Sequence, residues 1–296
     1  MQPRPMPFIV GSPRSGTTLL RLMLDAQSTL AIPPETGFLD AAGGWTAGGD
    51  ELRNQLVQTL TSYPADAPAW PDFHLSAIEF RARLFELTPF NVAEGVRLFY
   101  RMYAERFGKT RWGDKTPIYC RRIEQIERLL PEARFVHVVR DGRDAAVSLR
   151  RQWFSPGDDI RLQACYWSDN VTAARSQGRR CRQYMEVRYE SLIEDPGMVL
   201  REICAFLDLD FEPQMLRWYE RAPARLAEHL ERRNADGSLL VTHEQRLLQQ
   251  AATTQPADSG RIGAWRRQLT REEVLAFDAV AGDALRAFGY PVDDVR

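Results

Sequence analysis

The sequence has no long hydrophobic run. No stretch of about 18 apolar residues occurs in the 296-residue chain, so no membrane span is expected. The residues before the first glycine loop also lack the apolar core of roughly 7–15 residues that a signal peptide needs. Internal repeats and long low-complexity tracts are absent as well. We therefore expect neither a membrane-spanning protein nor a repeat architecture.

Cysteine is scarce and scattered. The chain has four cysteines, and none of them forms a C-x-x-C pair. Paired cysteines at short spacing are typical of zinc sites, and denser cysteine patterns are typical of disulfide frameworks. We therefore expect no metal site and reduced, mostly buried thiols in a cytoplasmic protein. The four positions are Cys120, Cys165, Cys181 and Cys204.

An excess of charge of either sign is also missing. The formal net charge is −1, with 27 % charged and 44 % hydrophobic residues, as in ordinary soluble globular proteins. Nucleic-acid binding is usually accompanied by a basic excess, so a general nucleic-acid binder is not expected. The length is sufficient for one large α/β domain or two small ones.

Short apolar, β-branched runs alternate with helical patterns at least four times. This alternation predicts an α/β fold with a mainly parallel sheet flanked by helices. The expected strands are Phe8–Val10, Leu30–Pro34, Arg134–Arg140 and Met185–Tyr189, and Arg111–Pro117 is expected to form a short strand and loop. We expect a single domain over residues 1–296, with a helical insertion at about 40–110 and a C-terminal helical region at about 196–296.

Two local predictions follow from helix patterns near the centre of the chain. Apolar residues at helical spacing predict one continuous helix over Ile118–Leu130. The turn after Arg140 is followed by a short helix that ends at Leu149. Asp144 is expected to cap that helix.

The first glycine loop resembles a phosphate loop without its lysine. Gly11, Gly16 and Thr18 fit the pattern G-x-x-x-x-G-K-[ST], but Thr17 stands in the lysine position. A strand, a tight loop and a helix N-terminus direct backbone N–H groups toward one anion. With Arg14 inside the loop, the pattern predicts a cradle for a nucleotide other than a triphosphate. An ordinary βα turn is the alternative.

A second group of anion-binding candidates follows the best predicted strand. Arg140, Arg143 and Ser148 lie in the segment VVRDGRDAAVS, and arginine binds phosphate oxygens with its planar fork. Arg261 and Trp265 form a third group, in which Trp265 either stacks on a purine or packs in the core. The first glycine loop and the segment after Arg140 thus give two separate anion sites at strand-to-helix junctions. Two such sites predict a nucleotide with phosphates at both ends.

These segments resemble sulfotransferases. PFIVGSPRSGTTLLRLMLDA is similar to the family's 5′-phosphosulfate loop, and RFVHVVRDGRDAAVSL is similar to its 3′-phosphate motif. The run PRSGTTLLRLMLDAQSTLAIPPET is closest to the tyrosylprotein sulfotransferase branch and its bacterial relatives. RIGAWRRQLT resembles the C-terminal glycine–tryptophan segment. The resemblance covers 7–41 and 111–189.

The resemblance implies 3′-phosphoadenosine-5′-phosphosulfate (PAPS) as the donor, with in-line sulfuryl transfer to a hydroxyl group and no metal. Residues of the first loop would hold the 5′-phosphosulfate, and residues of the second motif would hold the 3′-phosphate. The implied nucleotide-binding residues are Arg14, Ser15, Gly16, Thr17, Thr18, Arg140, Ser148, Tyr189 and Arg261.

The same resemblance implies three catalytic residues. Glu35 matches the catalytic base of the tyrosylprotein branch, and Lys115 matches a lysine near the leaving group. Arg14 would help to stabilise the leaving phosphate. A carboxylate can accept the hydroxyl proton, and cations can stabilise the developing negative charge. The alternatives are a surface carboxylate or N-cap for Glu35 and a solvated loop lysine for Lys115.

Some sulfotransferases use histidine as the base, and His74 is the less favoured alternative to Glu35 for that role. His137 is expected in the core of its strand. His229 and His243 lie in charged stretches and are expected to be solvated.

The acceptor stays open at this point. Thr116 replaces an acid of the tyrosylprotein branch, and Gly37-Phe38 follow Glu35-Thr36 where that branch has a basic residue. A small molecule, a sugar, a lipid or a peptide tyrosine all fit, and the oligomeric state is open. The alternatives to a sulfotransferase are a phosphate-loop small-molecule kinase, in which Lys115 replaces the missing lysine, and a non-catalytic nucleotide-binding protein.

Overall fold

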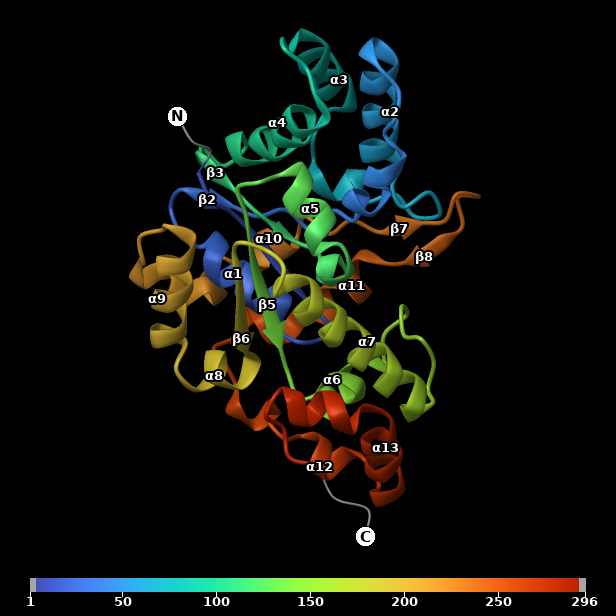
Figure 1. Cartoon of the computed structure of the whole chain (residues 1–296), viewed down its shortest axis with the longest axis vertical. Helices are drawn as coiled ribbons and strands as arrows, with labels where there is room; N and C mark the ends of the chain where they lie inside the picture. The colour runs from blue at the N-terminus through green and yellow to red at the C-terminus, as the bar shows by residue number, and fades with distance from the viewer. Residues whose placement is uncertain (1–3, 293–296) are drawn as a thin grey trace.

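A computed structural model describes residues 4–292 and contains a parallel β-sheet with helices on both faces (Figure 1). The strand order is β4-β1-β5-β6, and every neighbouring pair in this sheet is parallel. The α/β class predicted from the sequence is confirmed. The strands are β1 Met6–Gly11, β2 Leu30–Ala31, β3 Arg111–Trp112, β4 Asp114–Lys115, β5 Ala133–Val139, β6 Tyr184–Arg188, β7 Arg232–Arg233 and β8 Leu239–Val241.

The helices separate these strands and cover the sheet. None of those in residues 4–292 combines the length and the hydropathy of a bilayer span. The α-helices are α1 Thr17–Asp25, α2 Gly49–Ser62, α3 Ala77–Glu86, α4 Val92–Glu105, α5 Ile123–Leu129, α6 Gly142–Leu149, α7 Ile160–Gly178, α8 Tyr189–Glu194, α9 Pro196–Leu207, α10 Ala222–Leu226, α11 His243–Gln250, α12 Trp265–Gln268 and α13 Arg271–Ala287. The 3₁₀ helices are Phe38–Gly44, Trp70–Phe73, Pro117–Arg121, Pro213–Glu220, Ala251–Thr254 and Ser259–Arg261.

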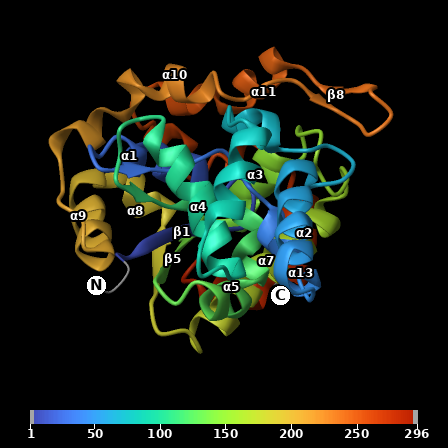
Figure 2. The ribbon, with the colours of Figure 1, turned by 90° about the horizontal axis from the view of Figure 1, so that it is seen from above.

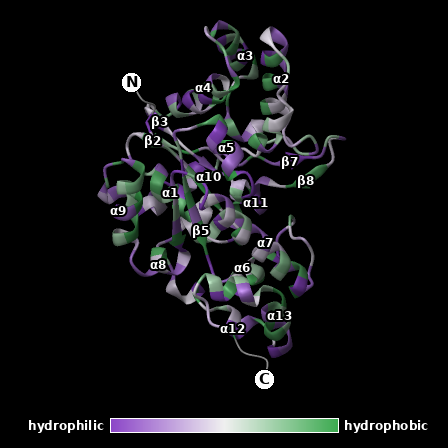
Figure 3. Cartoon of the chain, in the orientation of Figure 1, coloured by the Kyte–Doolittle hydropathy of each residue, from purple (hydrophilic) through white to green (hydrophobic). Residues whose placement is uncertain are grey.

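The central strands are apolar because both faces of the sheet are buried. Phe8 and Val10 of β1 face a cluster that includes α4 and α5, whereas Ile9 and Val136 face a cluster that includes α1 and α9. Successive side chains of a strand point to opposite faces, so a strand covered on both sides reads as a continuous apolar run. Figure 3 shows this hydrophobic colouring along β5.

The region between β2 and β3 is mainly helical. It contains α2, α3 and α4, which lie at the end of the molecule opposite α12 and α13 (Figure 1). The side chains of Ser76 and Asn91 cap the N-termini of α3 and α4 by accepting from backbone N–H groups. Phe73, Phe80 and Phe99 pack together in the core of this region.

Two local predictions are wrong. The predicted helix Ile118–Leu130 is divided into a 3₁₀ turn and α5 because Arg122, at φ −130° and ψ 13°, leaves the helical region. Asp144 does not cap α6. Asp141 does so, and its side chain accepts from the backbone N–H of Arg143. The Asp144 carboxylate instead accepts from the N–H groups of Gly263 and Trp265, both at 2.8 Å.

The segment from α10 to α11 lies along one side of the molecule, beside α1 (Figure 2). It contains the antiparallel pair β7–β8, and the predicted loop at 234–237 joins these two strands. Hydrogen bonds between Asn234 and Ser238 close the turn. The hairpin extends away from the sheet (Figure 1), whereas α11 contacts the first glycine loop, because Arg14 Nη2 donates to the carbonyl of Gln249.

Candidate active site

A cavity of about 330 Å³ lies where the parallel strands end. The chain beyond each strand of the main sheet contributes to its wall: Arg14 follows β1, Arg140 follows β5 and Tyr189 follows β6, while Lys115 is the last residue of β4. Ligands of open α/β sheets bind outside the carboxyl ends of the strands. The topology therefore brings segments that are far apart in the sequence to one site.

The loop between β1 and α1 is shaped for an anion. Gly16 has φ 96°, and a Cβ atom at this position would lie 2.4 Å from Cδ2 of Tyr189. No side chain caps the N-terminus of α1, so the first N–H groups of the helix have no side-chain acceptor. The buried hydroxyl of Ser15 has no hydrogen-bond partner within residues 4–292. These groups together fit a phosphate or a sulfate.

Two of the residues in the second group of anion-binding candidates, Arg140 and Ser148, lie directly beside this loop. Arg14 Nε donates to Ser148 Oγ at 3.0 Å, and Arg140 Nη1 donates to the carbonyl of Arg14 at 3.3 Å. The Arg140 guanidinium lies 4.4 Å from the ring centre of Tyr189. Burial and then the charge of Arg140 lower the pKa of Arg14 to about 10. Two crowded guanidinium groups create a strongly positive region that an anion would stabilise.

The C-terminal part of the chain covers this end of the cavity. Arg140 Nη2 donates to the carbonyl of Arg261 at 2.9 Å, and Arg14 Nη2 donates to the carbonyl of Gln249 at 3.1 Å. Arg140 Nε is buried and has no partner among the described residues. Arg14 and Arg140 therefore hold the C-terminal part of the chain, and Arg140 keeps one N–H donor for another partner.

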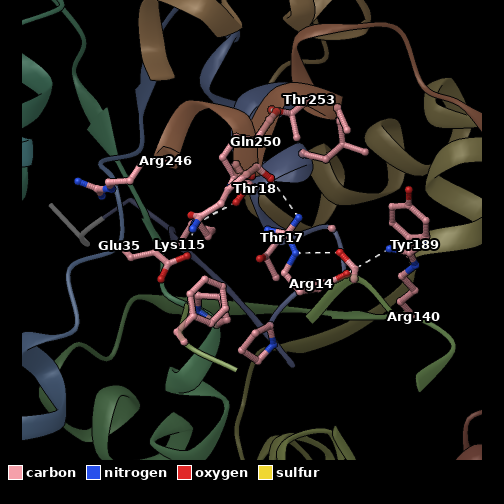
Figure 4. A pocket seen from close by; sticks show the side chains of 18 of the residues that line it. Arg14, Thr17, Thr18, Glu35, Lys115, Arg140, Tyr189, Arg246, Gln250 and Thr253 are labelled. Atoms are coloured by element: carbon pink, nitrogen blue, oxygen red, sulfur yellow. Dashed lines mark hydrogen bonds and ion pairs between the residues drawn. The ribbon is translucent and has the colours of Figure 1, made fainter. Parts of the chain in front are cut away.

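Glu35 and Lys115 form an ion pair at the other end of the cavity. Lys115 Nζ lies 2.6 Å from Glu35 Oε1 and 3.2 Å from Thr18 Oγ1. Figure 4 shows this pair on one side of Thr17, with Arg140 and Tyr189 on the other. The Lys115 side chain is 3 % exposed, whereas 49 % of the Glu35 side chain remains accessible. The carboxylate is therefore open to a molecule that enters the cavity.

The surroundings favour an ionised Glu35. Loss of hydration inside the cavity opposes ionisation, but the charge and hydrogen bond of Lys115, together with Arg232 and Arg246, lower the pKa of Glu35 below its usual range. Burial lowers the pKa of Lys115, and Glu35 opposes that shift. Each partner thus stabilises the charged form of the other.

A buried hydrogen-bond network fixes the chain on both sides of this pair. Thr36 Oγ1 donates to Asp114 Oδ2 at 2.7 Å, and the Thr36 backbone N–H donates to Thr116 Oγ1 at 3.0 Å. Tyr100 OH also donates to Asp114 Oδ2, at 2.8 Å. Burial raises the pKa of Asp114 to about 6, and these donors oppose that shift. The residues next to Glu35 and Lys115 are therefore joined directly.

Most of the predicted site residues meet in this one cavity. Its wall includes Arg14, Gly16, Thr17, Thr18, Glu35, Lys115, Arg140, Ser148, Tyr189 and Arg261, whereas Ser15 is buried in the loop behind it.

Arg143 and Trp265 are not part of the cavity wall. The prediction that Arg143 binds an anion beside Arg140 and Ser148 is wrong. The Arg143 guanidinium pairs with Asp141 at 2.9 Å and lies 3.9 Å from the Trp265 ring centre. Trp265 packs in the apolar cluster of α7 and α13, which resolves its two alternatives in favour of the core.

The histidines differ in their positions. His137 is fully buried in β5, as predicted. His74 is exposed and does not line the cavity; its Nε2 lies 3.2 Å from the Glu228 carbonyl. His229 was expected to be solvated, which is wrong, because it is partly buried and lines the cavity. His243 is also partly buried, with Nδ1 2.5 Å from the carbonyl of His229.

The sequence did not indicate several residues of the wall. Arg232 and Arg246 come from β7 and α11, and the exposed aromatic side chains of Trp153 and Phe154 come from the connection between α6 and α7. No motif marks these positions. Glycine punctuation and apolar periodicity identify the β1–α1 loop, but these wall residues follow no such pattern.

Known proteins resemble this chain in sequence. A family model described as "Sulfotransferase family" matches residues 5–213. The nodulation protein NoeE of Sinorhizobium fredii is 28 % identical, and the alignment covers 96 % of this chain and 65 % of NoeE. A protein-tyrosine sulfotransferase of Drosophila melanogaster is 28 % identical over 73 % of this chain and 40 % of that protein. The chain thus spans less than two thirds of either relative.

Solved structures share the fold. A sulfotransferase domain from the curacin biosynthetic pathway superposes with a TM-score of 0.65 at 18 % identity, covering 99 % of this chain and 100 % of that chain. The corresponding domain of the Synechococcus PCC 7002 olefin synthase gives 0.63 at 23 % identity, covering 99 % and 97 %. Mouse SULT7A1 is a sulfotransferase solved in complex with PAP (adenosine 3′,5′-bisphosphate). It superposes with a TM-score of 0.51 at 15 % identity, covering 96 % of this chain and 86 % of that chain.

Proposed function

This chain belongs to the sulfotransferase family, and we propose that it transfers a sulfuryl group from PAPS to the hydroxyl group of an acceptor. One observation carries the proposal. Lys115 Nζ contacts both Thr18 of the anion-binding loop and Glu35. A cation between an anion cradle and an accessible carboxylate is the arrangement that group transfer to a hydroxyl requires.

The cavity fits a nucleotide with anionic groups at both ends. The β1–α1 loop and the N-terminus of α1 would hold the 5′ end, and Arg140 with Ser148 would hold the 3′-phosphate. The unpartnered Ser15 Oγ and Arg140 Nε support this fit, because buried polar groups normally have partners. Arg14 Nε donates to Ser148 Oγ. The Arg14 guanidinium therefore lies between the residues proposed for the 5′ end and those proposed for the 3′-phosphate. When bound, PAPS supplies the sulfuryl group that is transferred.

Glu35 is proposed to act as the general base. Its lowered pKa keeps the carboxylate ionised at neutral pH, and its accessible surface can meet an acceptor hydroxyl. As the new S–O bond forms, the hydroxyl proton passes to a Glu35 oxygen. The contacts of Thr36 and Thr116 fix the position of this carboxylate, which favours a short and direct proton transfer.

Lys115 and Arg14 are proposed to stabilise the negative charge that develops on the leaving phosphate. Lys115 is almost fully buried, so its charge acts in a low-dielectric environment where electrostatic stabilisation is strong. One well-placed donor of this kind contributes roughly 3–4 kcal/mol to the transition state. Neither role requires a covalent intermediate on the protein.

The identity of the acceptor is a separate part of the proposal. Some relatives are named protein-tyrosine sulfotransferases. In this chain Thr116, which replaces an acid of that branch, binds the Thr36 backbone, so its side chain helps to position Glu35. We therefore propose a hydroxyl-bearing acceptor without restricting it to a peptide tyrosine.

A transfer assay tests the proposed function. Purified protein is incubated with radiolabelled PAPS and a library of phenols, sugars, lipids and tyrosine peptides. We expect label in one acceptor class together with equimolar adenosine 3′,5′-bisphosphate (PAP). A folded protein that binds neither PAPS nor PAP contradicts the proposal. A melting temperature that rises with ATP and Mg²⁺, but not with PAP, favours the kinase alternative.

A further inference from the structure

Two arginines of the C-terminal segment lie at the Glu35 end of the cavity. Arg232 of β7 and Arg246 of α11 both line the wall, and both lower the pKa of Glu35. Their side chains are 14 % and 9 % exposed. They are therefore largely removed from water while remaining beside the space that an acceptor would occupy.

One carboxylate holds both arginines. Arg246 binds Asp72 through two hydrogen bonds of 2.8 and 2.6 Å, and Arg232 Nη2 binds the same carboxylate at 3.2 Å. Asp72 is 2 % exposed and comes from the helical region before α3. Two guanidinium groups on one carboxylate leave a net positive charge in the wall. Arg232 Nε, which is buried, has no partner in the described part of the chain.

The neighbouring groups do not neutralise this charge. Glu35 is already paired with Lys115 at 2.6 Å. His229 contributes no negative charge, and burial, followed by the charges of Arg246 and Arg21, lowers its pKa to about 3. A positive charge that is removed from water and not fully paired is costly. An anionic group on a ligand would restore the balance.

This positive region is separate from the groups proposed for the nucleotide. Figure 4 shows Arg246, Glu35 and Lys115 on one side of Thr17, with Arg140 and Tyr189 on the other. The anion that Arg232 and Arg246 fit is therefore on the acceptor side of Glu35. Building on the proposed function, we infer that the acceptor is a hydroxyl compound that carries a carboxylate or a similar oxyanion, bound by Arg232 and Arg246.

The rest of the wall indicates the character of the acceptor body. Ile118, Trp153 and Phe154 line the cavity, and each exposes more than a third of its surface, at 39 %, 46 % and 37 %. The two aromatic rings contact each other edge to face, with their centroids 5.3 Å apart. Exposed apolar side chains in a cavity wall fit an apolar or aromatic ligand. A hydroxyaromatic carboxylate is therefore a suitable probe.

The test compares two probes that differ only in charge. The complex of the protein with PAP is titrated with para-hydroxyphenylacetate and with para-hydroxyphenylacetamide, and binding is followed by calorimetry and ligand NMR. We expect the carboxylate to bind at least about tenfold more tightly than the amide, because charge-assisted hydrogen bonds are stronger than neutral ones. This comparison uses the unmodified protein and does not depend on the folding of any variant.

Variants then assign the preference to the two arginines. Arg232→Gln and Arg246→Gln should remove the preference for the carboxylate and leave the affinity for PAP unchanged. Arg233→Gln is the matched control, because Arg233 is adjacent, exposed and paired with Glu231. Equal binding of the two probes, no binding of either to a protein that binds PAP, or an equal loss in Arg233→Gln would overturn the inference. Failure to bind PAP would instead contradict the proposed function on which the inference rests.

Discussion

Lys115 and Glu35 are 80 positions apart in the sequence, yet Lys115 Nζ lies 2.6 Å from Glu35 Oε1. The Lys115 side chain is buried and that of Glu35 is half accessible, so the pair presents a carboxylate to the cavity with a fixed cation behind it. Because Lys115 Nζ also contacts Thr18 Oγ1, this relationship joins the start of α1 to the proposed base and leads to the predictions below.

Replacing the proposed base should affect turnover more than nucleotide binding. Glu35→Gln keeps the size of the side chain but removes its ability to accept the hydroxyl proton. We expect kcat to fall about 100-fold or more, because general bases typically contribute that much. The dissociation constant for PAP, measured by calorimetry, should change by less than about threefold, since such a change corresponds to well under 1 kcal/mol. An unchanged kcat would reject the assignment, and Glu51→Gln on the exposed side of α2 is the control.

The pH dependence of the reaction should reveal the ion pair. The pKa of Glu35 is lowered, so the rate should fall only below its usual pKa of about 4.3, as the carboxylate becomes protonated. Lys115→Met removes the cation that opposes the effect of burial, and the pKa of Glu35 should then rise. We expect the acidic limb of the kcat/KM profile to move to higher pH, in addition to a loss of rate. An acidic limb at the same pH in both proteins would show that Glu35 is not the titrating group.

The close packing of the anion-binding loop gives a test of structure. Gly16→Ala places a Cβ atom 2.4 Å from the Tyr189 ring at a residue with φ 96°. We expect a loss of stability of about 1–3 kcal/mol, the usual cost of such strain, together with weaker binding of PAP. Gly43→Ala is the matched control, because no atom beyond its chain neighbours and its own helical turn lies within 4 Å of its Cβ position. Denaturant unfolding measures both variants, and equal effects would contradict the account of the loop.

The carboxylate that holds Arg232 and Arg246 should be important for stability. Asp72→Asn breaks a buried pair, which typically costs about 3–5 kcal/mol. Asp50→Asn is the control, because the Asp50 side chain is 75 % exposed and such pairs contribute at most about 1 kcal/mol. Thermal unfolding at neutral pH measures the difference, and similar midpoints for the two variants would contradict this prediction.

The same carboxylate gives stability a defined dependence on pH. Burial tends to raise the pKa of Asp72, but its hydrogen bonds and ion pairs with Arg246 and Arg232 lower it below the usual value. A group whose pKa is lower in the folded state stabilises that state above its unfolded pKa, which is about 3.9 for aspartate. The contribution should therefore be present at neutral pH and disappear as the pH falls through the folded pKa. The difference in unfolding free energy between the native protein and Asp72→Asn should decrease over that acidic range.

The sequence predicts the β1–α1 loop and its anion-binding candidates because strong local signals mark them. Gly11 and Gly16 flank a tight turn, and the apolar runs of β1 and β5 reflect burial on both faces. Arg143 shows the limit of such signals. Its position beside Arg140 suggested an anion site, but Asp141 and the Trp265 ring hold it in the interior.

The arginines at the Glu35 end of the cavity could not be predicted in the same way. Arg232 and Arg246 reach the cavity because Asp72, 160 and 174 positions earlier, binds both. Asp144 was predicted to cap α6, but its carboxylate binds backbone N–H groups near Trp265 instead. This contact too joins distant parts of the chain. Long-range polar contacts of this kind leave no periodic pattern in a single sequence.

The most direct test of the central claim is a calorimetric comparison of PAP with AMP, which differ by the 3′-phosphate alone. If the cavity holds a nucleotide with phosphates at both ends, PAP should bind at least about 100-fold more tightly than AMP, because its 3′-phosphate would gain bonds from Arg140 and Ser148. Arg140→Ala should remove most of that difference, whereas Arg151→Ala, an exposed arginine just after α6, should preserve it. No detectable binding of PAP, or equal affinity for PAP and AMP, would contradict the account.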